Sequence, residues 1–353
     1  MTTTANGGVS GSVIEGVSKK SFTMGKLVSN FATPNTPAFS AALTGTNLFI
    51  DITFDAVNNT ATGILRNTSG QSSAAIAAWR NGWSTVLPIV KASDYKAQHT
   101  FSLQNTNNTN GPQGYGFGSF IVTEATGVLN ITGSLPDGSP LLCSTFVGQK
   151  GEVLLYQSLH ANRGSCFGKI EIVKVNAPAD NTLSGNLTWL KPASLPAAKD
   201  LVYSSGFGAL PLSLTALGGA LPTPLKGQRL LGVPDAADNA RLVFGGTSAN
   251  AAFNQLLRII NPNNTTGTTN TATISLPNTN SVALPTLTFA TGDFKGSFVL
   301  PGTTLATNRI APFFGQLVRT GGTIKGYGYY LMPTGTPTTT STRVSGSVEL
   351  KTP

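Results

Sequence analysis

The sequence GYGFGSFIVTEATGVLNITGSL at residues 114–135 contains two runs in which apolar and small or polar residues alternate. This alternation predicts half-buried β-strands over residues 117–123 and 128–135, with a turn between them. Pro136-Asp137-Gly138 then predicts a tight turn. Four further strands are expected at residues 141–147, 153–159, 166–173 and 183–190. Six consecutive strands with short connections indicate antiparallel neighbours in a curled sheet or barrel.

The hairpin at residues 114–135 has a second copy near the end of the chain. GYGFG at 114–118 is followed by TGSL at 132–135, and GYGYY at 326–330 is followed by SGSV at 345–348. Repetition of a supersecondary unit indicates a repeat architecture, with the hairpin marking the end of a repeat unit.

The closing strand of this hairpin also has a copy near the start of the chain. VSGSV at 344–348 recurs at residues 9–13, with no Gly-Tyr-Gly strand before it. Three partners are open for this candidate assembly strand: a strand of the same chain, a neighbouring subunit that receives it in trans, or an upstream partner that was cut away. The strand consists of Val9, Ser10, Gly11, Ser12 and Val13.

The remaining alternating segments predict an all-β fold. Earlier strands are expected at residues 48–54, 60–66, 74–79 and 99–103. Later ones are expected at residues 240–244, 253–260, 272–276, 286–289, 296–300, 314–319, 327–331 and 343–350. We expect two antiparallel β-meander domains, barrel- or sandwich-like, with short hairpins and few or no helices.

A stretch rich in proline and small residues gives the expected domain boundary. Residues 193–206 predict a linker between a first domain at residues 1–192 and a second at 207–353. Residues 1–16 are either part of the first domain, a strand of a preceding repeat, or a strand donated in trans.

Polar Asn/Thr-rich loops are expected at residues 105–110, 261–270 and 337–342. We expect these loops to be exposed and to form the most variable contact surfaces of the protein.

Glycine recurs inside the expected strands, usually after a small or apolar residue and two positions before an apolar one. Because glycine weakens a strand, its recurrence needs a reason: a tight bend at a barrel corner, a bulge, or a close approach of two backbones. Examples are Gly63, Gly133, Gly185, Gly296 and Gly315.

Composition favours an extracellular or cell-surface location. The 353 residues are 40% hydrophobic but only 10% charged, against roughly 25% in average globular proteins. The net charge of +9 is scattered along the sequence, which argues against a nucleic-acid binder and allows loose attraction to acidic polysaccharide. No apolar run is long enough for a membrane helix, and residues 1–30 lack the apolar region of a signal peptide. If the protein is secreted, we expect its signal to be removed or to lie upstream.

Signals for catalysis and cofactors are absent from the sequence, so we expect neither. His99 and His160 are the only histidines, and each is interpreted as a polar strand-end residue. Asp235 and Asp238 are weak candidates for a calcium site, because a turn in which Asp bonds its own backbone explains them equally well. An intramolecular isopeptide bond is possible where a lysine, an asparagine and a buried acid lie close together, but a sequence alone does not place such a group.

Four aromatic residues are candidates for contact with a glycan: Trp79, Trp83, Tyr115 and Tyr327. Exposed rings suit stacking on sugars, whereas buried rings fill a core, and the alternating positions favour the core. Cys143 and Cys166 are candidates for a disulfide. One full strand is expected between their strands, a separation of about 9.6 Å that favours free thiols.

A set of short motifs follows one another along the chain: GPQGYG (111–116), GSLPDGS (133–139), LLYQSL (154–159), FGKI (167–170), LSGNLTW (183–189), FFGQL (313–317), GYGYY (326–330) and VSGSVEL (344–350). In this order they resemble a Gly-rich β-repeat module of very large secreted bacterial surface proteins, which often carry immunoglobulin- or cadherin-like repeats. The resemblance covers most of residues 60–353. It implies a non-catalytic structural or adhesive role, with neighbouring copies or other repeats of the same surface protein as partners. A carbohydrate-binding module is the alternative.

Overall fold

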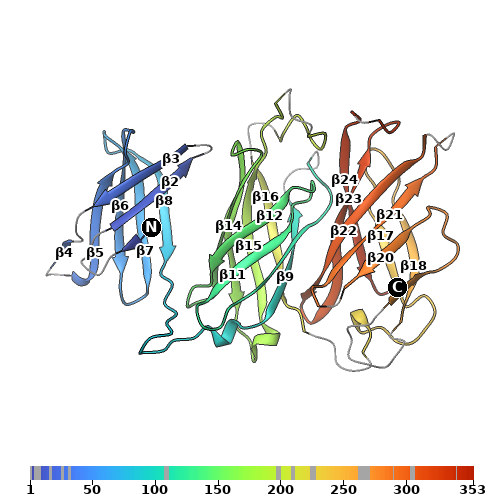
Figure 1. Ribbon diagram of the computed structural model, residues 1–353, viewed down its shortest axis with the longest axis horizontal. Helices are drawn as coiled ribbons and strands as arrows, with labels where there is room; N and C mark the ends of the chain where they lie inside the picture. Colours follow the sequence, from blue (N-terminus) through green and yellow to red (C-terminus); the bar gives the residue numbers. More distant parts are fainter. Residues whose placement is uncertain are drawn as a thin grey trace. The chain divides into compact units, whose positions relative to one another are not determined.

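The chain is all-β, as the alternating segments predict (Figure 1). The computed structural model describes the chain except residues 1, 4–8, 16–17, 25–27, 31–32, 107–110, 196–199, 208–210, 223–227, 261–270, 289, 303–306 and 339. The polar loop expected at 261–270, and parts of those at 105–110 and 337–342, therefore lie outside the described residues. The helical segments among the described residues are three single 3₁₀ turns, η1 (Ser93–Tyr95), η2 (Pro178–Asp180) and η3 (Leu230–Gly232). In the described part of the chain, no helix is long and apolar enough to span a membrane.

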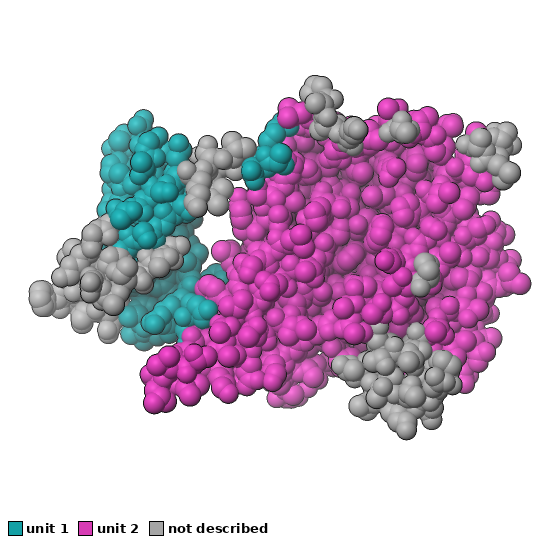
Figure 2. Space-filling view, in the orientation of Figure 1, with its two compact units in different colours: residues 1–82, 161–163 teal, residues 83–160, 164–353 magenta. Residues whose placement is uncertain are grey.

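The chain divides into two compact units (Figure 2). Unit 1 contains residues 1–82 and 161–163, and unit 2 contains residues 83–160 and 164–353. The expected linker at 193–206 lies inside unit 2, between two strands that are neighbours in one sheet. These residues do not separate two compact units, because the strand that follows them pairs with the strand that precedes them.

Unit 1 packs two antiparallel sheets around a small core. The first sheet has the order β1-β2-β3 and the second β4-β5-β6-β7-β8. Phe39 of β5 stacks on Phe22 of β3 and on Phe54 of β6, each with a ring-centre distance of 6.0 Å. The strands are β1 (Thr2–Thr3), β2 (Val9–Glu15), β3 (Ser18–Met24), β4 (Val28–Asn30), β5 (Thr33–Ala42), β6 (Leu48–Asp55), β7 (Thr60–Asn67) and β8 (Ser72–Trp79).

Unit 2 begins with a nearly closed, eight-stranded barrel, here called the first barrel. Its sheet order is β12-β11-β10-β9-β16-β15-β14-β13, so the first and last strands, β9 and β16, pair with each other. The open seam lies between β12 and β13, where Val147 and Val153 form a single bridge. The strands are β9 (Gln98–Asn105), β10 (Gly116–Ile121), β11 (Val128–Ser134), β12 (Pro140–Phe146), β13 (Glu152–Leu159), β14 (Gly164–Val173), β15 (Thr182–Leu190) and β16 (Leu212–Ala220).

The second barrel also has eight strands and pairs its first strand with its last. Its open seam lies between its third and fourth strands, whereas that of the first barrel lies between the fourth and fifth. Its order is β19-β18-β17-β24-β23-β22-β21-β20, with β17 paired to β24. The strands are β17 (Ala240–Phe244), β18 (Phe253–Ile260), β19 (Thr271–Ile274), β20 (Ala283–Leu287), β21 (Asp293–Leu300), β22 (Arg309–Thr320), β23 (Thr323–Pro333) and β24 (Arg343–Lys351). Residues 253–260, whose spacing also suits a helix, form the strand β18.

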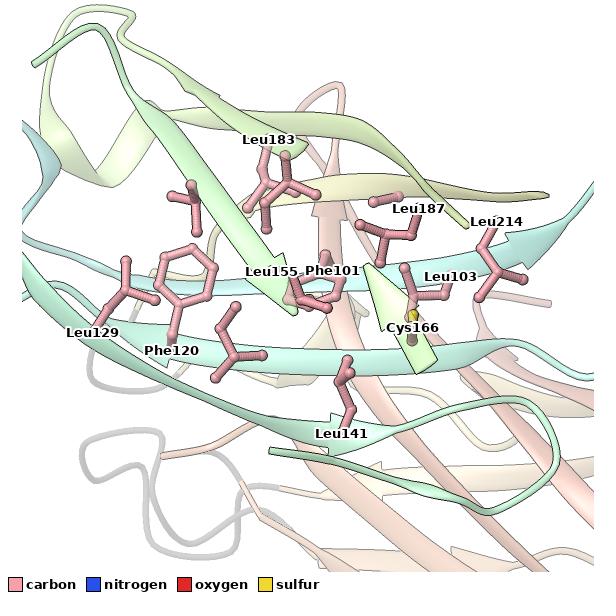
Figure 3. Close-up of a cluster of buried hydrophobic side chains, with 14 of the residues drawn as sticks. Phe101, Leu103, Phe120, Leu129, Leu141, Leu155, Cys166, Leu183, Leu187 and Leu214 are labelled. Carbon is pink, nitrogen blue, oxygen red and sulfur yellow. The ribbon is translucent and has the colours of Figure 1, made fainter. Parts of the chain in front are cut away.

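Each barrel has its own apolar core. In the first, side chains from all sides converge on the interior, among them Phe101, Leu155 and Leu187 (Figure 3). In the second, Phe244 lies at the centre of an aromatic cluster and contacts Phe253 and Phe298 at ring-centre distances of 4.6 and 4.7 Å. Inward positions alternate with outward ones along each strand, which explains why the sequence pattern located the strands.

The recurring glycines leave room for partner backbones and for rings. Gly118 of β10 pairs with Gly133 of β11, and the ring of Phe101 covers Gly118. In the second barrel Gly315 of β22 pairs with Gly328 of β23, and the ring of Phe294 covers Gly315. Both barrels thus use a cross-strand glycine pair beneath a phenylalanine ring. Close backbone approach, one of the expected reasons, explains these two pairs, with an aromatic ring filling the missing side-chain volume. A second expected reason, a bulge, applies to Gly296 of β21, where the pairing with β20 shifts register between Ala283 and Thr286.

Candidate functional site: the facing hairpins and the outer-face platform

The two copies of the repeated hairpin have the same register but different places in their barrels. Phe117 of β10 pairs with Ser134, and the matching Tyr329 of β23 pairs with Ser347. The first copy consists of the second and third strands of the first barrel, and the second copy consists of the last two strands of the second barrel. The copies therefore do not mark equivalent positions of two repeats.

Instead, the two hairpins face each other inside unit 2. Tyr115 meets its counterpart Tyr327 edge-on at a ring-centre distance of 5.1 Å, and Phe117 stacks on its counterpart Tyr329 at 6.1 Å. Contact between equivalent residues is the property of an isologous interface, here formed within one chain. We call this contact the hairpin junction. The expectation that these rings fill a core is revised, because they lie on the outer faces of the barrels and are covered by each other.

Hydrogen bonds tie the hairpin junction together. The backbone N–H of Tyr115 donates to the carbonyl of Gly328 at 3.0 Å, and the hydroxyl groups of Ser134 and Tyr329 lie 2.9 Å apart. The buried Ser345 of β24 donates to the carbonyl of Pro136, in the turn between β11 and β12. Polar groups on both sides of the contact are therefore paired, as burial requires.

Gly114 fits this junction because it has no side chain. A Cβ at this position would lie 2.6 Å from Ser345 Oγ and 2.9 Å from the carbonyl oxygen of Gly346, and closer still to Cβ of Tyr329. The first glycine of the first hairpin is thus required for contact with the second barrel.

Burial at the junction affects the tyrosines that were candidates for glycan contact. Burial, followed by the negative charge of Glu349, raises the pKa of Tyr115 to about 12, and the phenol donates to Glu349 Oε1 at 3.1 Å. Burial also raises the pKa of Tyr327. Both phenols stay protonated at any physiological pH, so each remains a neutral hydrogen-bonding group within the contact.

The two candidate tryptophans lie in different units. Trp79 ends β8 in unit 1 and pairs with Thr60. Trp83 belongs to unit 2, where its indole N–H donates to the carbonyl of Val147 at 2.6 Å and its ring meets Tyr95 edge-on at 6.0 Å. Trp83 therefore packs against the first core near the barrel seam.

The remaining predicted site residues have ordinary structural partners. Both carboxylate oxygens of Asp235 form ion pairs, one with Arg229 at 2.9 Å and one with Arg258 at 3.0 Å. The hydrogen bond from Arg258 and the charge of Arg229 hold the pKa of Asp235 below its usual range. Asp238 has a left-handed backbone (φ 51°), as in a turn. The described residues contain no group of three or more His, Cys, Asp or Glu side chains arranged to hold a metal ion.

Cys143 and Cys166 are free thiols, on β12 and β14. Cys166 is fully buried in the first core, and burial raises the pKa of its thiol to about 12. The candidate assembly strand, Val9–Val13, lies in β2, which pairs with β3 from Val9 opposite Met24 to Glu15 opposite Ser18. Within the described residues, this strand therefore has a partner in its own chain.

An exposed aromatic pair on the outer face of the first barrel was missed from the sequence. Tyr156 of β13 and Phe167 of β14 are directly paired across the sheet and are 37% and 39% exposed. Leu154 lies two residues before Tyr156 on the same face of β13 and is also exposed. The signal was present, because strict alternation puts Val153 and Leu155 inside and therefore Leu154 and Tyr156 outside.

A polar depression of about 470 Å³ adjoins this pair on β14 and β15. Lys169 and Glu171 form an ion pair at 3.1 Å along one side, and Asn186 accepts a hydrogen bond from Thr215 at 3.3 Å on the other. The aromatic pair and the depression together form what we call the outer-face platform. The depression is lined by Lys169, Glu171, Val173, Ser184, Gly185 and Asn186.

His99 is a buried titratable group inside the first barrel. It is fully buried, stacks on Phe120 at 5.1 Å, and donates from Nδ1 to the carbonyl of Ala97 at 3.1 Å. Its Nε2 has no hydrogen-bond partner among the described residues. Burial lowers the pKa of His99 from 6.5 to about 4, although the Ala97 carbonyl opposes this shift.

We expect His99 to make the stability of unit 2 depend on pH. The unfolded chain binds a proton at this site below pH 6.5 and the folded chain does not until about pH 4, so stability is complete above 6.5 and falls as the pH falls. Between pH 7 and pH 5 the free energy of unfolding should drop by about 2 kcal/mol. Urea denaturation at both pH values measures this drop. His99→Leu should remove it, and an equal drop in the variant would contradict the assignment.

Comparisons of the chain with protein-family models, with curated proteins and with solved structures find no match.

Proposed function

We propose that this chain is a non-catalytic structural or adhesive module of an extracellular bacterial surface protein. The observation that carries the proposal is the hairpin junction: two copies of one motif hold two separate barrels together within one compact unit. A module that must keep a fixed geometry along a surface protein benefits from such a joint. The weakly charged surface and the resemblance to surface-protein repeats also support this role.

Location is the first test of the proposal. An antibody raised against the purified chain should label intact cells of the source bacterium, and brief protease treatment of those cells should remove the signal. The same antibody applied to lysed cells measures the total amount. If the antibody labels only lysed cells, the proposed location at the cell surface is wrong. Electron microscopy of the purified chain should then show whether neighbouring copies associate into filaments.

The outer-face platform supports carbohydrate binding as a second candidate function. Sugars bind proteins by stacking on aromatic rings while nearby polar groups hydrogen-bond their hydroxyls, and the platform offers both. The ring pair supplies the apolar surface, and the depression supplies Lys169, Glu171 and Asn186.

A glycan array tests this second function. We expect saturable binding of an oligosaccharide that Phe167→Ala weakens about tenfold, equal to about 1.4 kcal/mol. Ile310→Ala is the matched control, because Ile310 is an exposed apolar residue of the second barrel. Trp79→Ala and Trp83→Ala test the residues proposed from the sequence. An array without saturable binding removes this candidate and leaves the structural one.

A further inference from the structure

A lysine and two aspartates meet at the end of the first barrel. Lys191 directly follows β15, and its Nζ lies 2.7 Å from Asp137 Oδ2 and 3.0 Å from Asp200 Oδ2. The side chains of Lys191 and Asp137 are each 1% exposed, whereas that of Asp200 is 32% exposed. Taking both charges of an ion pair out of water is costly, so this buried pair contributes little net stability to the fold.

The two aspartates are held in different ways. Oδ1 of Asp137 accepts the backbone N–H of Ser139 at 2.8 Å, which leaves Oδ2 to Lys191. Oδ1 of Asp200 accepts a hydrogen bond from the N–H of Val202 at 3.1 Å. Its Oδ2 contacts the same lysine and also lies 3.9 Å from Nδ1 of His160. The lysine nitrogen is thus in contact with one carboxyl group that is enclosed and with a second that reaches solvent.

The surroundings of Asp137 are apolar and aromatic. The fully buried Cys166 and the phenols of Tyr203 and Tyr329 lie close enough to be affected by its charge. Tyr203 in turn accepts the N–H of Ser345 at 3.2 Å, at the edge of the hairpin junction. In such a site, transfer of a proton from the ammonium to a carboxylate removes charge from a poorly solvating interior and leaves a nucleophilic amine.

We propose that Lys191 and Asp137 form an intramolecular isopeptide bond, with Asp200 as the proton carrier. Asp200 accepts a proton from the Lys191 ammonium, and the free amine attacks Cγ of Asp137. The Ser139 N–H stabilises the charge that develops on Oδ1. Asp200 then returns the proton to Oδ2, which leaves as water after taking a second proton from the nitrogen. One N–C bond forms, one C–O bond breaks, and an ammonium and a carboxylate become an amide and one water.

Proximity makes this reaction feasible without an added reagent. Groups fixed in contact by a fold react as if at very high effective concentration, about 10⁵ M or more for well-oriented pairs. The bond would join the turn between β11 and β12 to the end of β15, two points 54 residues apart in the chain. It would also fix the turn that contains Pro136, whose carbonyl accepts a hydrogen bond from the Ser345 hydroxyl across the hairpin junction. The proposal does not depend on the proposed function, because the bond is a covalent property of the folded chain.

Mass spectrometry of the purified full chain tests the bond. The intact mass should be lower than the sequence mass by one water, and a proteolytic digest should contain a branched peptide joining the Asp137 segment to the Lys191 segment. Asp137-Gly138 can also lose water by forming a succinimide, which produces no branched peptide.

Two variants separate these outcomes. Lys191→Met should restore the full mass, whereas a succinimide would persist in it. Asp200→Asn keeps the size of the proton carrier and should leave most of the chain unlinked. A wild-type chain of full mass, or one that loses water without a branched peptide, overturns the proposal. The wild-type digest decides the question even where Lys191→Met does not fold.

Discussion

Tyr329→Ala is expected to lower the free energy of unfolding of unit 2 by about 3–5 kcal/mol, the usual cost of truncating a buried aromatic residue. Tyr329 is 4% exposed and contacts rings from both barrels, Phe117 at 6.1 Å and Phe314 at 5.7 Å. Its hydroxyl is also bonded to Ser134. Truncation therefore opens a cavity at the hairpin junction and leaves Ser134 without this partner. Urea denaturation followed by fluorescence measures the loss.

The shape of the unfolding transition should change as well. In the wild type we expect the two barrels to unfold together, because the junction couples them. In Tyr329→Ala each barrel keeps its own core, so the transition should broaden or separate into two steps. Tyr329→Phe is the matched control: it removes only the hydroxyl and should cost about 1 kcal/mol with one transition. If Tyr329→Ala costs no more than Tyr329→Phe, the ring contacts do not hold the barrels together.

Gly133→Ala is expected to destabilise the first barrel by about 3 kcal/mol, at the upper end of the usual cost of overpacking. The new Cβ would collide with the carbonyl oxygen of Phe117 and lie 2.7 Å from the Cα of Gly118. Neither atom can move alone, because both belong to the backbone of the paired strand. The strands β10 and β11 must therefore separate or slip. The denaturant midpoint should fall while its slope stays the same.

Gly335→Ala is the control for this substitution. A Cβ on Gly335 would meet nothing within 4 Å, and its backbone is outside the left-handed region. This variant should change stability by no more than about 0.5 kcal/mol, as surface substitutions usually do. A loss at Gly133 as small as that at Gly335 would show that the glycine pair is not needed for close strand approach.

Strands with strict alternation and clear turns could be located from the sequence. The expected segments at 153–159 and 240–244 match β13 (Glu152–Leu159) and β17 (Ala240–Phe244) to within one residue. By contrast, β5 and β16 were missed. β5 contains two prolines, and the second half of β16 is LGGA, which has the composition of a loop. Both are strands because long-range pairing outweighs their weak local preference.

The domain boundary also could not be predicted from local sequence, because it depends on long-range strand pairing. Residues 193–206 have the composition of a linker, but the strand after them, β16, pairs with both β15 and β9 and closes the first barrel. No local pattern records a contact between Ala216 and Leu103. Likewise, Tyr156 and Phe167 could be placed on an outward face from alternation. Their position next to a depression that β14 forms together with a third strand, β15, could not.

The sequence by itself determined that the chain is all-β, where most strands lie, and that one glycine-rich hairpin occurs twice. These are local properties, set by alternation and turn chemistry over a few residues. Only the tertiary structure decided that each barrel closes by pairing its first and last strands and that the hairpin copies face each other. It alone brought Lys191 to Asp137, 54 residues away. The physical reason is that pairing between distant strands depends on which faces bury together, and many pairings satisfy the same local pattern.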